Sequence, residues 1–103
     1  MIAEVKVTDE SWKPSYSEEV WKILVRHNGK YLSKSPNIKS QEGTKDLDLI
    51  VLVEFSSMKD AQNFFNDADY APIMKARQDG SVSTFTLIDD TDVTGQIPYL
   101  KKG

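Results

Sequence analysis

The chain has 103 residues, of which 39% are hydrophobic and 28% charged, and its formal net charge is −3. This length suits one domain around one core, and the composition is ordinary for a globular protein. There is no cysteine, which excludes disulfides, thiolate catalysis and thiolate metal sites. The net negative charge argues against a nucleic-acid partner. No apolar run approaches the roughly 20 residues that span a bilayer, so we expect no membrane partner and, by default, a cytoplasmic location.

The first third of the chain predicts a strand followed by a helix. Apolar and charged residues alternate over residues 2–7, which is typical of a half-buried strand. Apolar residues then recur at helical spacing over residues 12–24. Two starting points are open: the helix begins near Ser11, with Pro14 in its first turn, or it begins at Ser15.

The middle of the chain predicts two strands separated by a loop. Asn28-Gly29 is typical of the left-handed end of a helix, and a short strand is expected over residues 30–34. Residues 36–46 are polar and indicate a loop. Residues 49–55 are almost all apolar with strong β propensity, so we predict a strand that is covered on both faces.

The second half predicts two helices, a strand and a tail. Ser57 opens an approximate capping box, which indicates a helix start. A second, short helix is expected to be capped by Asp69 and to end at Gly80. Residues 82–89 alternate again and predict the last strand, and residues 90–103 are polar and indicate a tail or arm.

This order predicts a ferredoxin-like βαββαβ fold of the α+β class over residues 1–89, with a four-stranded antiparallel sheet and helices on one face. Side chains alternate along a strand, so Ile50 and Leu52 lie on the sheet face opposite the helices. A bare face carrying them would be an exposed apolar patch. We therefore predict a homodimer that forms through the open sheet face.

Short motifs in both halves of the chain resemble one family. They are Val7-Thr8-Asp9, Tyr16, His27-Asn28-Gly29-Lys30-Tyr31-Leu32, Glu42-Gly43, Val53-Glu54-Phe55-Ser56-Ser57, Ala61, Phe65, Asp69-Tyr70 and Arg77. Over roughly residues 3–89 the chain is similar to the family called domain of unknown function 1330. The resemblance implies a dimeric α+β barrel, in which two ferredoxin-like sheets pack face to face, and no established activity. The chain departs from the family pattern at Ser33-Lys34-Ser35-Pro36, where an Arg-Gly-Gly-like stretch is common, and at Leu49, where an Arg is common.

Two residues are candidate catalytic groups. Glu54 shares its strand face with Leu52, so between packed sheets its pKa would rise and the carboxylate could act as a general base. Alternatively, Glu54 lies at the strand end and is solvated or paired with a lysine or arginine. His27, the single histidine, is the second candidate, although a histidine at a helix C-terminus is typical of a dipole partner or a packing residue. One histidine excludes two-histidine metal ligation, and we expect no metal and no cofactor.

Four residues are candidate ligand-binding groups: Tyr70, Arg77, Tyr31 and Trp12. Tyr70 and Arg77 are seven residues apart, so they lie on one helix face, where Arg77 could bind a carboxylate. The alternative is that Tyr70 packs and Arg77 pairs with an acid. Trp12, Tyr16 and Tyr31 could form an aromatic wall for a planar ligand, or, in the alternative, Trp12 and Tyr16 belong to the core face of the first helix.

Two classes of function follow from these residues. In the first, the protein binds a small organic molecule in a pocket beside the sheet and acts as a cofactor-independent enzyme. In the alternative, it is a non-catalytic dimeric binding or interaction module. The fold itself is compatible with either. A displaced pKa of Glu54, with loss of turnover in Glu54→Gln, would distinguish the enzyme.

Overall fold

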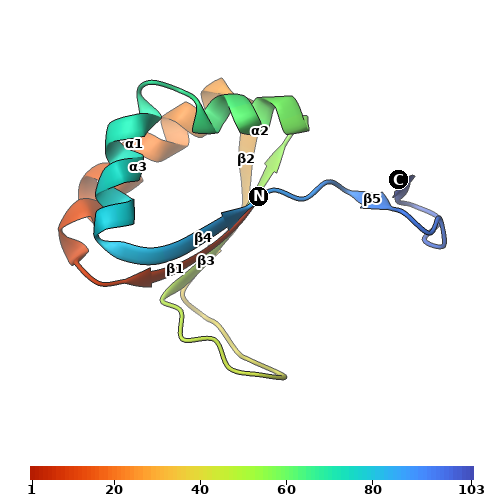
Figure 1. Cartoon of the computed structure of the whole chain (residues 1–103), viewed down its shortest axis with the longest axis horizontal. Helices are drawn as coiled ribbons and strands as arrows, with labels where there is room; N and C mark the ends of the chain where they lie inside the picture. The colour runs from red at the N-terminus through yellow and green to blue at the C-terminus, as the bar shows by residue number, and fades with distance from the viewer.

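Four strands form one antiparallel sheet in the order β2-β3-β1-β4, and three α-helices lie over one of its faces (Figure 1). The computed structural model describes residues 1–103. The strands are β1 (Ile2–Val7), β2 (Gly29–Ser35), β3 (Leu49–Phe55) and β4 (Ser81–Thr86). The helices are α1 (Lys13–Arg26), α2 (Met58–Phe65) and α3 (Tyr70–Asp79), and the 3₁₀ turn η1 (Glu10–Trp12) precedes α1.

The first helix begins close to the earlier of the two predicted starts. Asp9 accepts a hydrogen bond from the Ser11 amide and so caps η1, which runs directly into α1. Pro14 lies in the first turn of α1, where a missing amide hydrogen leaves no bond unmade. The helix therefore tolerates the proline, and Trp12 lies at its very start.

Asn28 and Gly29 have different roles where α1 gives way to β2. Asn28 takes the left-handed conformation, with a φ of 59°, which asparagine tolerates better than most residues. Gly29 is already the first residue of β2, where an added Cβ would lie 2.9 Å from the Leu24 carbonyl and 3.0 Å from the Phe55 ring. The left-handed residue is thus Asn28, and Gly29 is needed for the close approach of the strand to the helix.

Strand β3 spans the predicted residues and has the predicted alternation. Val51 and Val53 are buried beneath the helices, while Leu52 is 37% exposed and Glu54 is exposed. Opposite Leu52 on β1 lies Ile2, and opposite Ile50 lies Glu4. We call this second face of the sheet, which carries Ile2, Glu4, Lys6, Ile50, Leu52, Glu54, Val82, Thr84 and Thr86, the open face.

A β-bulge at Leu32 shifts the alternation of the edge strand β2. Tyr31 pairs with Val53, but Ser33 rather than Leu32 pairs with Leu52. The extra residue reverses the faces that follow, so that Lys34 pairs with Val51 on the helix-covered side.

The junction between α2 and α3 corrects one prediction, the capping role of Asp69. Ser57 caps α2 as expected, accepting a hydrogen bond from the Asp60 amide at 3.0 Å. Asp69, however, has helical backbone angles and caps nothing with its side chain. Its own amide instead donates to the Asp67 carboxylate at 2.8 Å. A side-chain cap requires extended backbone at the capping residue, and Asp69 lacks it.

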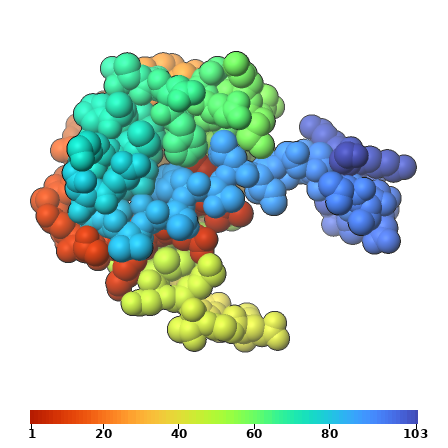
Figure 2. Space-filling model, in the orientation of Figure 1, coloured from red at the N-terminus to blue at the C-terminus, as the bar shows by residue number.

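Two segments project from the body of the domain (Figures 1 and 2). One is the loop between β2 and β3, whose Lys45 bonds to Glu4 on the open face. The other is the tail arm, residues 90–103, in which Thr91–Asp92 (β5) pairs in parallel with Lys101–Lys102 (β6). The radius of gyration is 15.0 Å, against about 13 Å for a compact chain of this length. None of the helices is long and apolar enough to cross a membrane.

Candidate functional site

A cavity of about 290 Å³ lies between α1 and the helix-covered face of the sheet. This volume is at the low end of the roughly 300–1,000 Å³ typical of ligand pockets. Its floor is formed by strand residues that include Ala3, Val5, Val51 and Val53, and α1 supplies Tyr16, Val20 and Leu24. We call it the α1 cavity. The lining is mostly hydrophobic, so the cavity suits an apolar molecule.

Exposed polar residues mark the mouth of the α1 cavity. Lys13 and Ser17 belong to the first turns of α1, Lys34 lies near the end of β2, and Asp48 immediately precedes β3. Lys34 belongs to this set because of the bulge at Leu32. A ligand entering here passes two lysines before it reaches the hydrophobic interior.

Three of the aromatic residues predicted to form a ligand wall line this cavity. They are Trp12, Tyr16 and Tyr31. The rings of Trp12 and Tyr16 meet edge to face, with centroids 5.2 Å apart. Trp12 is held by a 3.0 Å hydrogen bond from its indole nitrogen to the Gly80 carbonyl. The structure therefore places aromatic residues of η1, α1 and β2 around one cavity, and a role in ligand binding stays a prediction.

Tyr70 and Arg77 lie behind this wall and are joined to it by a chain of hydroxyl contacts. The hydroxyls of Tyr16 and Tyr70 are 2.7 Å apart. Arg77 Nη2 donates to the Tyr70 hydroxyl at 3.4 Å, and Nη1 donates to Ser83 Oγ at 2.7 Å. Neither Tyr70 nor Arg77 lines the α1 cavity. We call Arg77, Tyr70 and Tyr16 the hydroxyl chain.

Arg77 is a buried cation without an acidic partner. It is only 3% exposed, and no carboxylate contacts it. The predicted alternative of an ion pair at the helix end is therefore wrong. The guanidinium carbon lies 3.8 Å from the centroid of Phe85 and 5.7 Å from that of Tyr16, so aromatic faces replace a counter-ion. Nε has no hydrogen-bond partner.

Burial keeps the cavity tyrosines protonated. Desolvation raises the pKa of the Tyr16 hydroxyl, and the neighbouring Tyr70 raises it further. Burial likewise raises the pKa of Tyr31, with a smaller contribution from Tyr70. An ordinary tyrosine titrates near pH 10, so both hydroxyls remain neutral donors at physiological pH.

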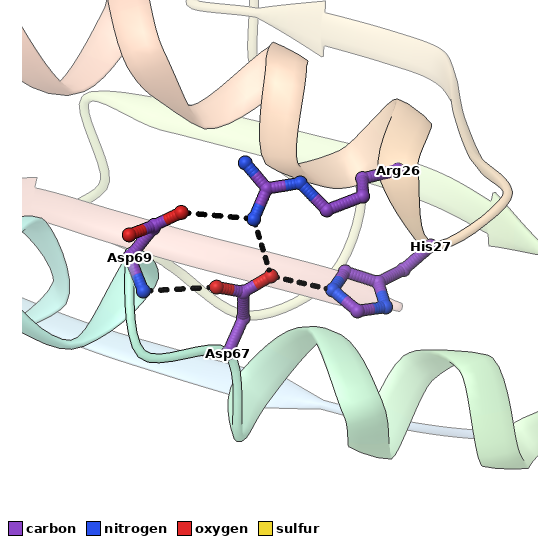
Figure 3. A network of polar contacts seen from close by, with 4 residues as sticks. All are labelled: Arg26, His27, Asp67 and Asp69. Atoms are coloured by element: carbon purple, nitrogen blue, oxygen red, sulfur yellow. Dashed lines mark hydrogen bonds and ion pairs between the residues drawn. The ribbon is translucent and has the colours of Figure 1, made fainter.

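His27 lies in a separate polar network at the junction of α1 with α2 and α3 (Figure 3). Its Nε2 is 2.7 Å from Asp67 Oδ2, which also accepts a hydrogen bond from Arg26 at 2.9 Å. The hydrogen bond to His27, followed by that from the Asp69 amide, lowers the pKa of Asp67. Arg26 bridges to Asp69 as well. These contacts tie the helix ends together, and His27 is not among the residues that line the α1 cavity.

Glu54 lies across the sheet from the α1 cavity. It is exposed and lines a wider groove of about 570 Å³ between the end of β3, the start of α2 and the root of the tail arm. Its strand neighbour is Lys30, with which no ion pair forms. Glu54 thus lies across the sheet from the cavity, whereas His27 lies among the helix ends outside the cavity lining. A catalytic role for either residue stays a prediction. The smaller α1 cavity is the better candidate site because it is set in the hydrophobic core.

The sequence contained a partial signal for the site. Helical spacing of Trp12 and Tyr16 was visible, as was the shared face of Tyr70 and Arg77. Ser83 and Phe85 were missed because their contacts with Arg77 join α3 to β4. Lys34 was missed because the bulge that redirects it leaves no mark in the alternation pattern.

Comparison with known proteins gives a fold relative and a family. The crystal structure of a protein of unknown function from Rhodopseudomonas palustris superposes with a TM-score of 0.66 and 15% sequence identity, over 85% of this chain and 81% of that one. This likeness concerns the fold alone. No curated protein matches the sequence. The family model described as "Domain of unknown function (DUF1330)" matches residues 1–91, and the chain belongs to this family.

Proposed function

We propose that the protein binds a small, largely apolar organic molecule in the α1 cavity. The observation that carries this proposal is the cavity itself, about 290 Å³ of space between α1 and the sheet that is lined mostly by hydrophobic side chains. Well-packed interiors hold few voids larger than a water molecule. A cavity of this size costs packing energy, and a ligand that fills it recovers that loss.

The polar groups of the cavity support a ligand with one polar end. Ligand sites combine an apolar lining with a few placed polar groups that set orientation. The α1 cavity has such groups in the hydroxyls of Tyr16 and Tyr31, and in Lys13 and Lys34 at its mouth. This distribution suits a single aromatic or branched aliphatic body carrying an oxygen function.

We further propose that the domain is ferredoxin-like and forms a homodimer through the open face. The strand order β2-β3-β1-β4 with antiparallel pairing supports the first part. Ile2, Leu52 and Val82 support the second, because they leave apolar surface on the open face, with Leu52 37% and Val82 68% exposed. The loop between β2 and β3 and the tail arm both project from the domain (Figure 1) and could contact a second copy.

The contacts described above favour binding without catalysis. Glu54 is exposed and lies on the sheet face opposite the α1 cavity. His27 is engaged with Asp67. Neither predicted catalytic residue therefore adjoins the ligand space, although a second subunit on the open face would desolvate Glu54 and permit the enzymatic alternative.

The binding proposal is tested by blocking the mouth of the cavity. Ser17→Trp places a large ring at an exposed lining position of α1, and Glu18→Trp is the matched control on the same helix outside the lining. Ethylbenzene, titrated by NMR and calorimetry, is expected to shift amide signals of Val20, Val51 and Val53 in the parent protein and in Glu18→Trp, but not in Ser17→Trp. Shifts confined to other residues, or equal binding by both variants, would contradict the proposal.

A further inference from the structure

The direction of hydrogen bonding along the hydroxyl chain is set by Arg77. A guanidinium only donates, so the Tyr70 oxygen accepts the bond from Arg77 Nη2. Tyr70 is completely buried, and its own hydroxyl hydrogen therefore needs an acceptor. The single hydroxyl partner within reach is Tyr16, at 2.7 Å. The arrangement that pairs both the oxygen and the hydrogen of the Tyr70 hydroxyl has Tyr70 donating to the oxygen of Tyr16.

This direction leaves the hydroxyl hydrogen of Tyr16 free. The Tyr16 oxygen already accepts from Tyr70, and Arg77, the other side chain that acts on this hydroxyl, can only donate to it. Tyr16 also lines the α1 cavity. Its remaining hydrogen can therefore be satisfied by an acceptor inside the cavity, whereas in the opposite direction the Tyr70 hydrogen would be buried without a partner.

We propose that Tyr16 is a specificity-determining hydrogen-bond donor, and that the ligand of the α1 cavity carries a carbonyl or carboxylate oxygen that accepts from it. Arg77 acts as a positioning residue through Tyr70, and its buried charge, which no acid neutralises, favours negative charge on that oxygen. The inference rests on the proposed function, because it requires that the cavity holds a ligand.

Two isosteric probes separate this inference from the binding proposal. Acetophenone differs from ethylbenzene in having a carbonyl in place of one methylene group, so the ratio of their dissociation constants reports the acceptor. We expect Tyr16→Phe, which keeps the ring, to shift this ratio against acetophenone by about two- to tenfold, the range of one hydrogen bond. Tyr99→Phe is the matched control, since Tyr99 is 87% exposed on the tail arm, and it is expected to leave the ratio unchanged.

Benzoate distinguishes the two kinds of acceptor. If the natural ligand class is a carboxylate, Tyr16→Phe weakens benzoate relative to ethylbenzene; if it is a neutral carbonyl, acetophenone alone is weakened. Ratios that are the same in the parent protein and in Tyr16→Phe for both probes would overturn the inference while ethylbenzene binding still supported the cavity. Failure of all three probes to bind would remove the proposed function together with the inference.

A second variant tests the positioning role. Tyr70→Phe removes the link between Arg77 and Tyr16 but leaves the Tyr16 hydroxyl in place. We expect the preference for acetophenone over ethylbenzene to decrease part of the way towards that of Tyr16→Phe, with ethylbenzene affinity retained. A purely structural role for Tyr70 would weaken both probes equally and leave the ratio unchanged, which would contradict the proposed chain.

Discussion

Arg77 lies over the ring of Phe85, with 3.8 Å between the guanidinium carbon and the ring centroid, and it makes no ion pair. Its charge is stabilised by the aromatic face and by two hydroxyls, those of Ser83 and Tyr70. Few charged side chains are fully buried without an opposite charge. This contact joins α3 to β4 directly beside the α1 cavity, so the wall of the cavity depends on it.

The first prediction separates the shape of Arg77 from its charge. Arg77→Lys keeps a cation but loses the planar group that stacks on Phe85 and donates to two hydroxyls at once. We expect it to lower the free energy of unfolding by about 1–3 kcal/mol. Arg77→Met removes the buried charge and conserves much of the volume, and we expect a change below about 1 kcal/mol. Urea denaturation measures both, and a larger loss in Arg77→Met than in Arg77→Lys would show that charge outweighs shape.

The second prediction concerns acid stability. Hydrogen bonds from His27 and the Asp69 amide lower the pKa of Asp67 from its ordinary value of 3.8. A lowered folded-state pKa contributes stability that is complete above the unfolded-state value and is lost as the pH falls towards the folded-state value. We therefore expect the urea midpoint of the parent protein to decrease as the pH is lowered below about 4. This decrease should be steeper than that of Asp67→Asn.

The control for this experiment is Asp79→Asn, which removes an exposed acid that pairs with Lys75 within α3. Exposed pairs of this kind contribute little, so its pH profile is expected to follow that of the parent protein. Asp9, Asp89 and Asp92 also have lowered pKa values, and some acid dependence therefore persists in Asp67→Asn. Identical slopes in the parent and in Asp67→Asn would contradict the prediction.

How far the sequence could predict this molecule depended on the range of the interactions involved. Strand β3 was predicted at Leu49–Phe55, because a nearly continuous apolar run with strong β propensity is a local property. The cap at Ser57 is local as well. Asp69 also follows a local rule for caps, yet its backbone is helical because its amide and carboxylate are held by Asp67 and Arg26.

The site was less predictable for the same physical reason. That Tyr70 and Arg77 share a face follows from helical geometry, and their 3.4 Å contact agrees with it. That Arg77 turns to Phe85 and Ser83, and that Tyr70 meets Tyr16 of another helix, depends on how α1, α3 and β4 pack. No pattern within one element contains that information.

The third prediction concerns the close approach of Trp12 to Gly80. A Cβ at Gly80 would lie 2.2 Å from Trp12 Cδ1, so Gly80→Ala must displace the indole and break its 3.0 Å bond to the Gly80 carbonyl. We expect a loss of about 1–3 kcal/mol, as for other overpacked sites. In a Trp21→Phe background, where Trp12 is the remaining tryptophan, its fluorescence should shift to longer wavelength as the ring becomes exposed.

A double-mutant cycle identifies the cause of that loss. If the clash with Trp12 is responsible, Gly80→Ala should cost much less in a Trp12→Leu background, because the smaller side chain leaves room for the methyl group. An equal cost in both backgrounds would place the effect in the α3 to β4 connection instead. The cycle thereby tests whether a backbone position in α3's C-terminal cap shapes the wall of the α1 cavity.

The last prediction concerns the proposed dimer. Leu52 lies in the middle of the open face between Ile2 on β1 and Ser33 on β2, and it is 37% exposed in the single chain. Leu52→Lys would bury an unpaired charge if a second copy covers this face, at a cost of several kcal/mol to association, but little to the fold. We expect sedimentation to show a dimer for the parent protein and a monomer of 11.7 kDa for Leu52→Lys. Val25→Lys, at a 61% exposed position on the outer side of α1, should remain a dimer. A parent protein that sediments as a monomer at micromolar concentration would contradict the dimer, and so would a dimer that Leu52→Lys leaves intact.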